Sequence, residues 1–374
     1  FVNNMIRLGY NSAGTSITSG LQFNGIFESS GTNNFFFNSI YVGGTGVATL
    51  SNNTFAFFSN ATTTTRYYGN NIFYNARSNA ASTGKHYAIK IAGTAPNPAG
   101  TTINFNDYLA DGTGGVLGQY NLVDQTTLAA WRIATGQDCN SISSNPKFVN
   151  PTGNSSTVDL HINTGMATPV EGAGQAVGFV TTDFDGQSRA SFSPTDIGAD
   201  AGNFILLDVS PPVINYIPLI SACGTGNQIL APVTIIDATG VPTGGATRPR
   251  IYYRKNAGSW FSSPGVLLTG TGQNGDWQFT IFASDMAGLA LGDVIDYYVI
   301  AQDMAVPINI ISSPCGAVAT DVNTVSTAPT MLNTIVVKDP MSGLYTVGIG
   351  GNYTTLTAAI ADYNNRCLVG PVTF

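Results

Sequence analysis

Four aspartates between residues 183 and 200 are the strongest candidates for a chemically active site. Asp183 and Asp185 stand in the segment DFDG, and Asp196 and Asp200 stand in DIGAD. Carboxylate oxygens are the ligands that Ca²⁺ takes in proteins, so these four side chains are candidates for a calcium site. Their spacing differs from that of an EF-hand loop, and Arg189 lies between them. We therefore favour the alternative, in which Arg189 and the aspartates form a clamp of charged hydrogen bonds.

The two histidines are the other side chains that could transfer protons or bind a metal. His161 follows Asp159 by two residues in DLHI, so in a strand both side chains point to one face. A local hydrogen bond is the expected role of this pair. His86, in KHYAIKI, has no nearby acid to orient it, and we expect a structural histidine. With two histidines and no CxxC pair, the sequence predicts no zinc site and no other cofactor.

The charged residues of the first half do not favour catalysis. Glycosidic cleavage normally needs two carboxylates that face each other across the bond, and residues 1–106 contain one, Glu28. A lyase needs a base and cations that stabilise the developing charge. The cations are scattered and have no acids nearby, as Arg66, Arg77, Lys85 and Lys90 show. We expect no enzymatic activity, and a polysaccharide-degrading enzyme is the last of the alternatives.

The composition excludes two classes of partner. Charged residues make up 9 % of the 374 residues, the net charge is −7, and the mean hydropathy is +0.12. An acidic chain has no basic patch that could neutralise nucleic-acid phosphates. The uncharged stretch from Ser29 to Thr65 contains many polar residues, so no membrane span is expected. Phe1 begins in the middle of the pattern, and we interpret the chain as an excerpt of a longer protein.

The four cysteines favour a disulfide over a metal site, given the secreted character of the chain. Cys223 and Cys315 fall within one predicted domain, and we expect a disulfide between them, the alternative being two buried free thiols. Cys139 and Cys367 lie in different predicted domains, and the sequence does not pair them.

The elements that position these residues begin with a repeated pattern in residues 1–110. Blocks with β-prone cores begin near residues 33, 51, 67, 85 and 101, in steps of about 16 to 18 residues, and such periodicity predicts a solenoid. The blocks are NNFFFNSIYVGG, SNNTFAFFSN, YYGNNIFYNAR, KHYAIKIAG and TTINFNDYLA, each with one or two strands. Six asparagines are expected in left-handed turns or in amide ladders between coils: Asn24, Asn38, Asn53, Asn71, Asn75 and Asn104. The aromatic residues of the blocks fill the core or stack between coils, and an exposed row of them is able to bind sugars.

A helix and a second β-rich region follow. Residues 126–136 predict a helix that begins after a threonine cap and ends at Gly136, with Trp131 packed on the solenoid. After Pro211 and Pro212, alternating apolar runs separated by turn residues predict an antiparallel β-sandwich. In VIDYYVIAQD, one face is expected to carry Ile295, Tyr297, Val299 and Ala301, and the other Asp296 and Tyr298.

The last segment predicts a new element of the first kind. Residues 343–365 contain a threonine cap and a helix with Leu356, Ile360 and Tyr363 on one stripe, and GPVTF follows as a strand. The expected domains are 1–206, the C-terminal part of a parallel β-helix; 207–341, a β-sandwich; and 342–374, the start of a further β-helix.

These segments resemble parts of right-handed parallel β-helix and immunoglobulin- or fibronectin-like repeat units of giant bacterial secreted surface proteins. Those that resemble the β-helix are NNIFYNAR, GKHYAI, TTLAAWRIATGQDCNSIS, NPKFVNP, DLHI, DFDGQSR and DIGADAG, the last as a closing motif. DATGVPTGGATRPRIYYRKNAG and GDVIDYYVIAQD resemble the sandwich modules, and NYTTLTAAIADYN resembles the helix that caps a new β-helix.

The resemblance implies a structural or adhesive repeat unit of a large extracellular fibre or adhesin. It implies an all-β fold, secretion to the bacterial cell surface, and partners that are further repeats of the same polypeptide or other copies of it. The alternative is a carbohydrate-binding module that recognises surface glycans. The resemblance carries no catalytic residue, because none of its motifs contains one.

Overall fold

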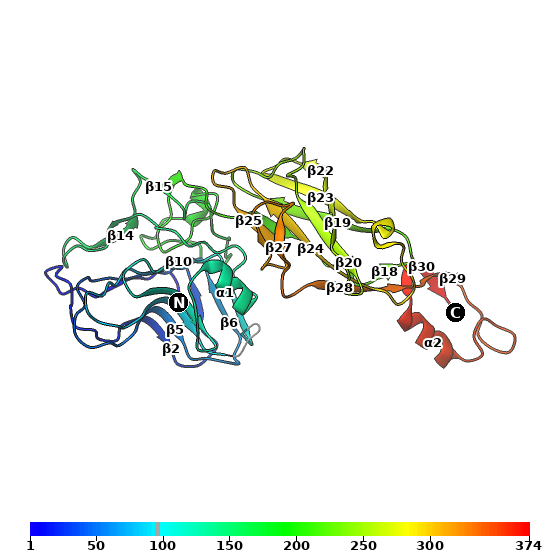
Figure 1. The fold of residues 1–374 in the computed structure, drawn as a ribbon, viewed down its shortest axis with the longest axis horizontal. Helices are drawn as coiled ribbons and strands as arrows, with labels where there is room; N and C mark the ends of the chain where they lie inside the picture. Colours follow the sequence, from blue (N-terminus) through cyan, green and yellow to red (C-terminus); the bar gives the residue numbers. More distant parts are fainter. Residues whose placement is uncertain (94–97) are drawn as a thin grey trace. The chain divides into compact units, whose positions relative to one another are not determined.

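The computed structural model describes residues 1–93 and 98–374. These residues form two compact units, one of Phe1–Pro211 with Ala305–Asn309 and one of Pro212–Met304 with Ile310–Phe374. Both units consist mainly of β-strands, and helices are few (Figure 1). As expected, no helix of the described residues is long and apolar enough to cross a membrane.

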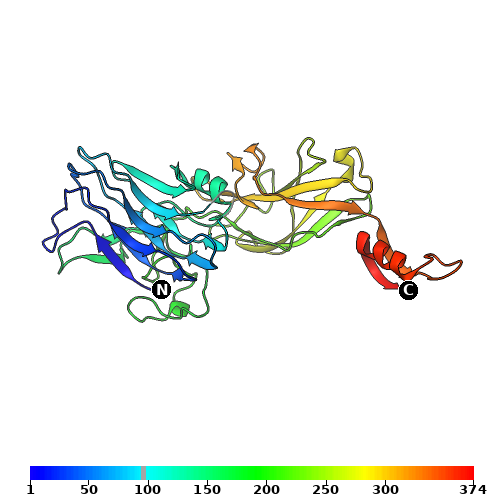
Figure 2. The ribbon, with the colours of Figure 1, turned by 90° about the horizontal axis from the view of Figure 1, so that it is seen from below.

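The first unit is built on a parallel β-helix whose strands stack in three sheets (Figure 2). The first sheet contains β1 (Met5–Leu8), β4 (Ser39–Val42), β7 (Ile72–Asn75) and β10 (Asp107–Leu109). The second contains β2 (Asn24–Glu28), β5 (Thr54–Ser59), β8 (His86–Ile91) and β11 (Gly115–Tyr120), with antiparallel β12 (Val123–Gln125) at its edge. The third contains β3 (Asn34–Phe36), β6 (Arg66–Gly69) and β9 (Thr101–Asn104). The predicted solenoid is confirmed.

A ladder of asparagines at one corner marks the repeat. Asn4, Asn38, Asn71 and Asn106 occupy equivalent positions, separated by 34, 33 and 35 residues. The Nδ2 of each donates to the Oδ1 of the next, at 2.7, 2.8 and 2.9 Å. One coil therefore spans two of the predicted blocks. The shorter predicted step is that of half a coil, because one block supplies β3 and β4 and the next supplies β5.

The corner itself is formed by the residue before each ladder asparagine. Asn3, Phe37, Asn70 and Phe105 have φ values of 56°, 55°, 57° and 58°. The prediction of left-handed turns is wrong for all six asparagines named above, since none has a positive φ. The prediction of a ladder is confirmed at Asn38 and Asn71. The amides bond from coil to coil, and the sharp change of direction falls one residue earlier.

Aromatic rings form a continuous contact through the core of the β-helix. The ring centroids from Phe35 to Phe57, Phe73, Tyr108 and Trp131 are 5.2, 5.0, 6.0 and 6.2 Å apart in succession. Trp131 lies on α1 (Leu128–Thr135), which begins after the Thr127 cap and ends at Gly136 in the left-handed conformation. The predicted helix and the inward position of Trp131 are both confirmed, since its side chain is fully buried.

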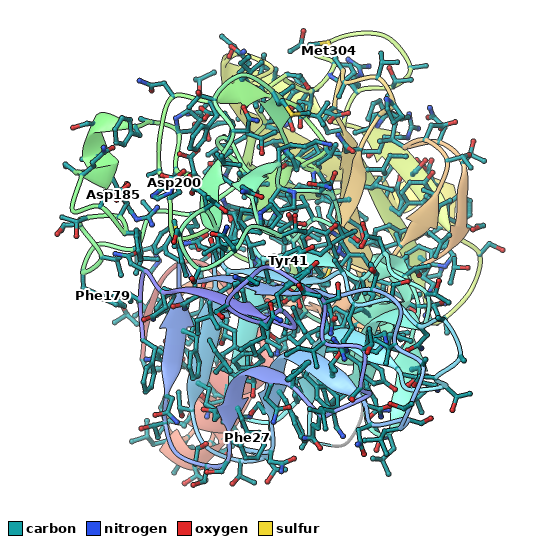
Figure 3. The ribbon with its side chains drawn as sticks, turned by 90° about the vertical axis from the view of Figure 1, so that its left-hand side faces the viewer. Phe27, Tyr41, Phe179, Asp185, Asp200 and Met304 are labelled. Atoms are coloured by element: carbon teal, nitrogen blue, oxygen red, sulfur yellow. A yellow bond between two sulfur atoms is a disulfide. The ribbon has the colours of Figure 1, made fainter. Side chains whose placement is uncertain are left out.

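The chain then covers the outer face of the first sheet. This outer layer contains β13 (Phe148–Asn150), β14 (Asp159–Ile162), β15 (Ala167–Thr168), β16 (Ile205–Leu206) and the short helix η1 (Arg189–Ser191). Apolar side chains of the layer, such as Leu160 and Ile197, pack against Tyr41 and Ile72. Figure 3 shows Tyr41 between the strands of the β-helix and this layer.

The segment DIGADAG lies within the outer layer rather than at the end of the stack. The N–H of Gly198 donates to the carbonyl of Asn70 at 2.9 Å, and that of Ala199 to Oγ of Ser39 at 2.9 Å. Gly198 has a φ of +104°, and a Cβ there would lie 2.6 Å from a methyl group of Ile72. A glycine is therefore required for this close approach.

The second unit contains an antiparallel sandwich, as predicted. One sheet has the order β17 (Val213–Asn215), β19 (Gln228–Ile236), β23 (Asn274–Ile281) and β22 (Val266–Gly270). The other has β18 (Ala222–Cys223), β28 (Asn333–Lys338), β24 (Val294–Gln302), β20 (Arg250–Lys255) and β21 (Phe261–Pro264), with β25 (Ile310–Ser313) also paired to β24. Two short strands, β26 (Val318–Ala319) and β27 (Val325–Thr327), pair with each other, and η2 (Ala283–Met286) follows β23. On β24, Ile295, Tyr297, Val299 and Ala301 face the central core, which confirms the predicted alternation.

The last segment folds as two parallel strands joined by a helix. They are β29 (Pro340–Leu344), α2 (Leu356–Asn365) and β30 (Cys367–Thr373). Leu356 and Ile360 are 57 % and 48 % exposed, so the predicted apolar stripe is accessible to solvent.

The predicted Cys223–Cys315 disulfide is wrong. Cys223 is bonded to Cys367, across 144 residues and with a Cα–Cα distance of 5.4 Å. Strand β18 lies beside the end of β28, and the N–H of Cys367 donates to the carbonyl of Asp339 just after β28 at 3.1 Å. This arrangement brings β30 to Cys223. Cys139 and Cys315 are not free thiols either.

Candidate functional site

The four aspartates singled out by the sequence lie in the outer layer, but they do not act together. Asp183 organises its own turn, since its Oδ1 accepts the N–H groups of Asp185 and Gln187 at 3.0 and 2.7 Å. Asp196 is used twice by the backbone, accepting from Gly172 and Gly202 at 2.9 and 3.0 Å. Asp185 and Asp200 instead meet His161. Asp196 is therefore a structural carboxylate and stands apart from the other three.

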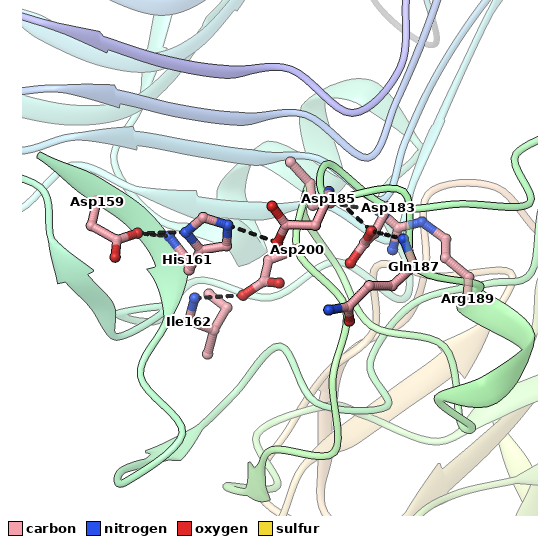
Figure 4. Close-up of polar contacts among 9 residues, drawn as sticks. Asp159, His161, Ile162, Asp183, Asp185, Gln187, Arg189 and Asp200 are labelled. Atoms are coloured by element: carbon pink, nitrogen blue, oxygen red, sulfur yellow. Dashed lines mark hydrogen bonds and ion pairs between the residues drawn. The ribbon is translucent and has the colours of Figure 1, made fainter.

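His161 is the centre of the cluster that forms (Figure 4). Its Nδ1 lies 2.6 Å from Oδ1 of Asp159, and its Nε2 lies 3.0 Å from Oδ2 of Asp185. Nitrogen and carboxylate atoms of His161, Asp185 and Asp200 all lie within 4.8 Å of one another. The local bond between Asp159 and His161 was expected, whereas the approach of Asp185 and Asp200 was not.

Asp200 reaches the cluster because the backbone holds it there. Its Oδ2 accepts the N–H of Ile162, 38 residues away, at 2.7 Å. Burial raises the pKa of Asp200, although the N–H of Ile162 and the charge of His161 oppose this effect. The charges of Asp183 and Asp185 raise the pKa further. Asp200 therefore shares one electrostatic environment with both acids of the DFDG turn.

The surrounding acids also change the pKa of the His161 imidazole. Burial lowers the pKa of His161, but the hydrogen bond with Asp159 and the negative charges of Asp200, Asp159 and Asp185 outweigh it, so the pKa is raised. His161 and Asp185 remain accessible, with side-chain exposures of 33 % and 44 %. An ion from solvent is therefore able to reach the cluster.

Arg189 forms a clamp, but on carbonyl groups rather than on carboxylates. Its Nη2 donates to the carbonyls of Gly198 and Ala199 at 2.9 and 3.0 Å and to Oδ1 of Asn3 at 3.0 Å. The guanidinium lies over the ring of Phe37, 3.9 Å from its centroid. Among residues 1–93 and 98–374, no ion pair joins it to an aspartate, so the predicted Arg–Asp clamp is corrected. Arg189 thereby links Gly198 and Ala199 to Asn3 and Phe37 of the first coils, beside a hollow of about 310 Å³.

His86 is a structural histidine, as expected. It is buried, with Nδ1 2.9 Å from Oγ1 of Thr54 and Nε2 3.0 Å from Oδ1 of Asn79. Burial is the first cause, and the charge of Arg77 the second, that lowers the pKa of His86 to about 4. The ring is neutral at pH 7 and serves the packing between coils.

The carboxylates inside the β-helix are buried and held. Glu28 accepts hydrogen bonds from the hydroxyls of Ser59 and Tyr68. Asp107 accepts the N–H of Ser144 at 3.0 Å, and burial raises its pKa to about 7. Both side chains are at most 3 % exposed. Neither lies open to a substrate.

One group of aromatic side chains lies on the outer surface of the second sheet. Phe27 pairs with Phe58 in the register of β2 and β5, and their ring centroids are 5.1 Å apart. Lys90 lies beside them, with Nζ 4.5 Å from the centroid of Phe58. Phe27 is 50 % exposed. This short row has the residue types that stack on sugar rings.

No protein-family model matches the chain. No curated protein shows significant similarity to it.

Proposed function

We propose that this chain is a structural and adhesive repeat unit of a large extracellular protein of the bacterial cell surface. The β-helix is the stiff part of the unit, and the sandwich is an immunoglobulin- or fibronectin-like spacer. The segment β29–α2–β30 is the start of a further β-helix, and the partners are other repeats or other copies of the chain.

The asparagine ladder is the observation that carries this proposal. Every ladder amide bonds to the adjacent coil, and the aromatic core is continuous from Phe35 to Trp131. The buried amide side chains of the ladder thus hydrogen-bond adjacent coils to each other. A stack whose buried ladder amides bond from coil to coil resists separation of its coils, as an element under tension must.

The disulfide supports the role of the sandwich as a spacer. The bond between Cys223 and Cys367 ties β18 of the sandwich to β30 of the following segment. A covalent tie at this junction passes tension from one module to the next without loss of the fold. Such bonds persist in extracellular compartments.

Single-molecule pulling tests the mechanical role. With handles at the two ends of residues 1–374, we expect the β-helix to open coil by coil. Each step should lengthen the chain by about 12 nm, since a coil of about 34 residues extends by about 3.5 Å per residue. The matched variants are Asn71→Ala in the ladder and Asn60→Ala on an exposed position. If both variants open at the force of the natural chain, the ladder does not bear load and the proposal is wrong.

A second candidate function is binding of surface glycans through Phe27, Phe58 and Lys90. The exposed ring of Phe27 and the adjacent cation favour a sugar that carries a carboxylate. Binding to a panel of neutral and acidic polysaccharides should be lost in Phe27→Ala and kept in Phe184→Ala, which removes another half-exposed ring. Release of reducing ends from any of these polysaccharides would instead indicate an enzyme.

A further inference from the structure

Three separate segments of the outer layer converge on His161. The imidazole lies on β14, Asp185 comes from the DFDG turn 24 residues later, and Asp200 comes from DIGAD. The neighbouring backbone fixes two of them, because Asp200 is anchored by Ile162 and the DFDG turn is held by Asp183. Figure 4 shows the three side chains directed toward one another. The cluster is thus built by the fold.

The hydrogen bonds of His161 determine which ring nitrogen is free. Oδ1 of Asp159 accepts the backbone N–H of His161 at 2.9 Å and also faces Nδ1 at 2.6 Å. A carboxylate only accepts, so Nδ1 carries the hydrogen. Nε2 of the neutral ring then presents a lone pair to Oδ2 of Asp185 at 3.0 Å. Two lone pairs at this distance repel each other, and the positive charge that joins them is either a proton on Nε2 or a bound metal ion.

A second observation indicates the same need for positive charge. Asp183 is 3 % exposed, and its Oδ2 has no hydrogen-bond partner among the described residues. Figure 4 shows the Asp183 carboxylate next to Asp185, with dashed lines to the backbone N–H groups of Asp185 and Gln187. A buried carboxylate oxygen without a partner favours positive charge nearby, and Arg189 already supplies part of that charge to Asp183.

We propose that His161, Asp185 and Asp200 bind a divalent transition-metal ion of the Zn²⁺ class. Asp159 orients the imidazole through Nδ1, and Asp183 adds negative charge from beside the site. An imidazole with carboxylates is a ligand set that suits Zn²⁺, whereas Ca²⁺ takes oxygen ligands only. The sequence predicted no such site, because two histidines and no CxxC pair do not match the zinc sites that are rich in cysteine and histidine.

The distances are compatible with such an ion. Ligand atoms around tetrahedral Zn²⁺ lie about 3.4 Å apart when each bond is about 2.1 Å. The atoms of this cluster lie within 4.8 Å of one another, and Asp185, the exposed member, is the side chain able to rotate toward the other two. The pairing of Asp159 with the imidazole is the arrangement that fixes metal-binding histidines in other proteins.

A bound ion would join β14, the DFDG turn and the DIGAD segment. These segments form the outer layer over the first sheet, where regular strand pairing is sparse. An ion that binds only the folded layer stabilises it in proportion to the logarithm of its concentration. The bound ion would therefore cross-link the three segments of the outer layer.

Titration calorimetry on chelator-treated residues 1–374, with the disulfides intact, tests this inference. We expect one Zn²⁺ per chain at the cluster and weaker binding of Ca²⁺. His161→Gln and Asp200→Asn should each weaken Zn²⁺ binding at least tenfold, and Asp159→Asn by about 10- to 100-fold, as expected for an orienting carboxylate. Asp111→Asn is the matched control, since it removes an exposed carboxylate outside the cluster. Circular dichroism without metal shows whether each variant is folded.

Each contrary result has a defined meaning. Zn²⁺ binding that is unchanged in Asp200→Asn and His161→Gln places the ion elsewhere and overturns the assignment. Tighter binding of Ca²⁺ than of Zn²⁺ overturns the choice of metal. The absence of any binding leaves a protonated His161 bridging two aspartates, and the inference is then wrong. None of these outcomes affects the pulling experiment, which depends on the ladder.

Discussion

Truncation of Asn71 to alanine should destabilise the β-helix far more than truncation of an exposed asparagine. Asn71 is fully buried and makes four side-chain hydrogen bonds. Its Oδ1 accepts from the backbone N and from Nδ2 of Asn38, at 3.1 and 2.8 Å. Its Nδ2 donates to the carbonyl of Phe35 and to Oδ1 of Asn106, both at 2.9 Å.

The cost follows from the groups left behind. The N–H of Asn38 loses its acceptor inside the stack, which costs about 1–3 kcal/mol. Nδ2 of Asn38 still reaches the carbonyl of Phe36 at 3.1 Å, and Oδ1 of Asn106 still accepts the N–H of residue 71, so these groups add little. The small cavity adds about 1 kcal/mol. We expect a total loss of about 2–4 kcal/mol in the free energy of unfolding of the first unit.

Urea unfolding of the first unit, followed by circular dichroism, measures this loss. Asn60→Ala is the control, because Asn60 is exposed, and it should change the free energy of unfolding by less than about 0.5 kcal/mol. Asn71→Asp should be at least as harmful as Asn71→Ala, since a carboxylate cannot donate to Phe35 or Asn106. A difference below about 1 kcal/mol between Asn71→Ala and Asn60→Ala would refute the reasoning, because the buried N–H would then cost nothing.

Three further results are expected. Trp131→Phe keeps an aromatic ring in the core but removes the indole N–H that donates to Oδ2 of Asp138 at 2.6 Å, so it should cost about 1–3 kcal/mol in urea unfolding; an unchanged midpoint contradicts this. The pKa of His86 is lowered to about 4 by burial, below its unfolded value, so its contribution to stability is complete above about pH 6.5 and is lost as the pH falls toward 4. The unfolding free energy should therefore fall by up to about 3 kcal/mol more in the natural chain than in His86→Gln over that range, and parallel pH profiles would disprove the assignment. Cys223→Ser removes a bond that closes a loop across 144 residues. The variant should expose β30 to proteolysis, and the free energy of unfolding should fall by at most about 5 kcal/mol, the loop entropy that the bond removes from the unfolded chain. Equal cleavage rates with and without the bond would show that it does not hold β30 in place.

The sequence by itself determined the kind of architecture in both units. Repeated apolar cores at a fixed spacing between turn residues favour stacked coils, because each coil buries its short strands against its neighbours. The alternation on β24 and the threonine and glycine limits of α1 are local signals, since each depends on residues within one element. For the same reason, the bond between Asp159 and His161 could be expected from their spacing of two along a strand.

The tertiary structure alone decided which distant residues meet. Asp200 reaches His161 because Ile162 donates to it across 38 residues, and Cys367 reaches Cys223 because two strands end side by side. Neither contact leaves a periodic trace, as each depends on how a loop returns to the fold. The coil length was likewise decided by the ladder from Asn38 to Asn71, since two similar half-coils look like two repeats until their hydrogen bonds show that they form one turn.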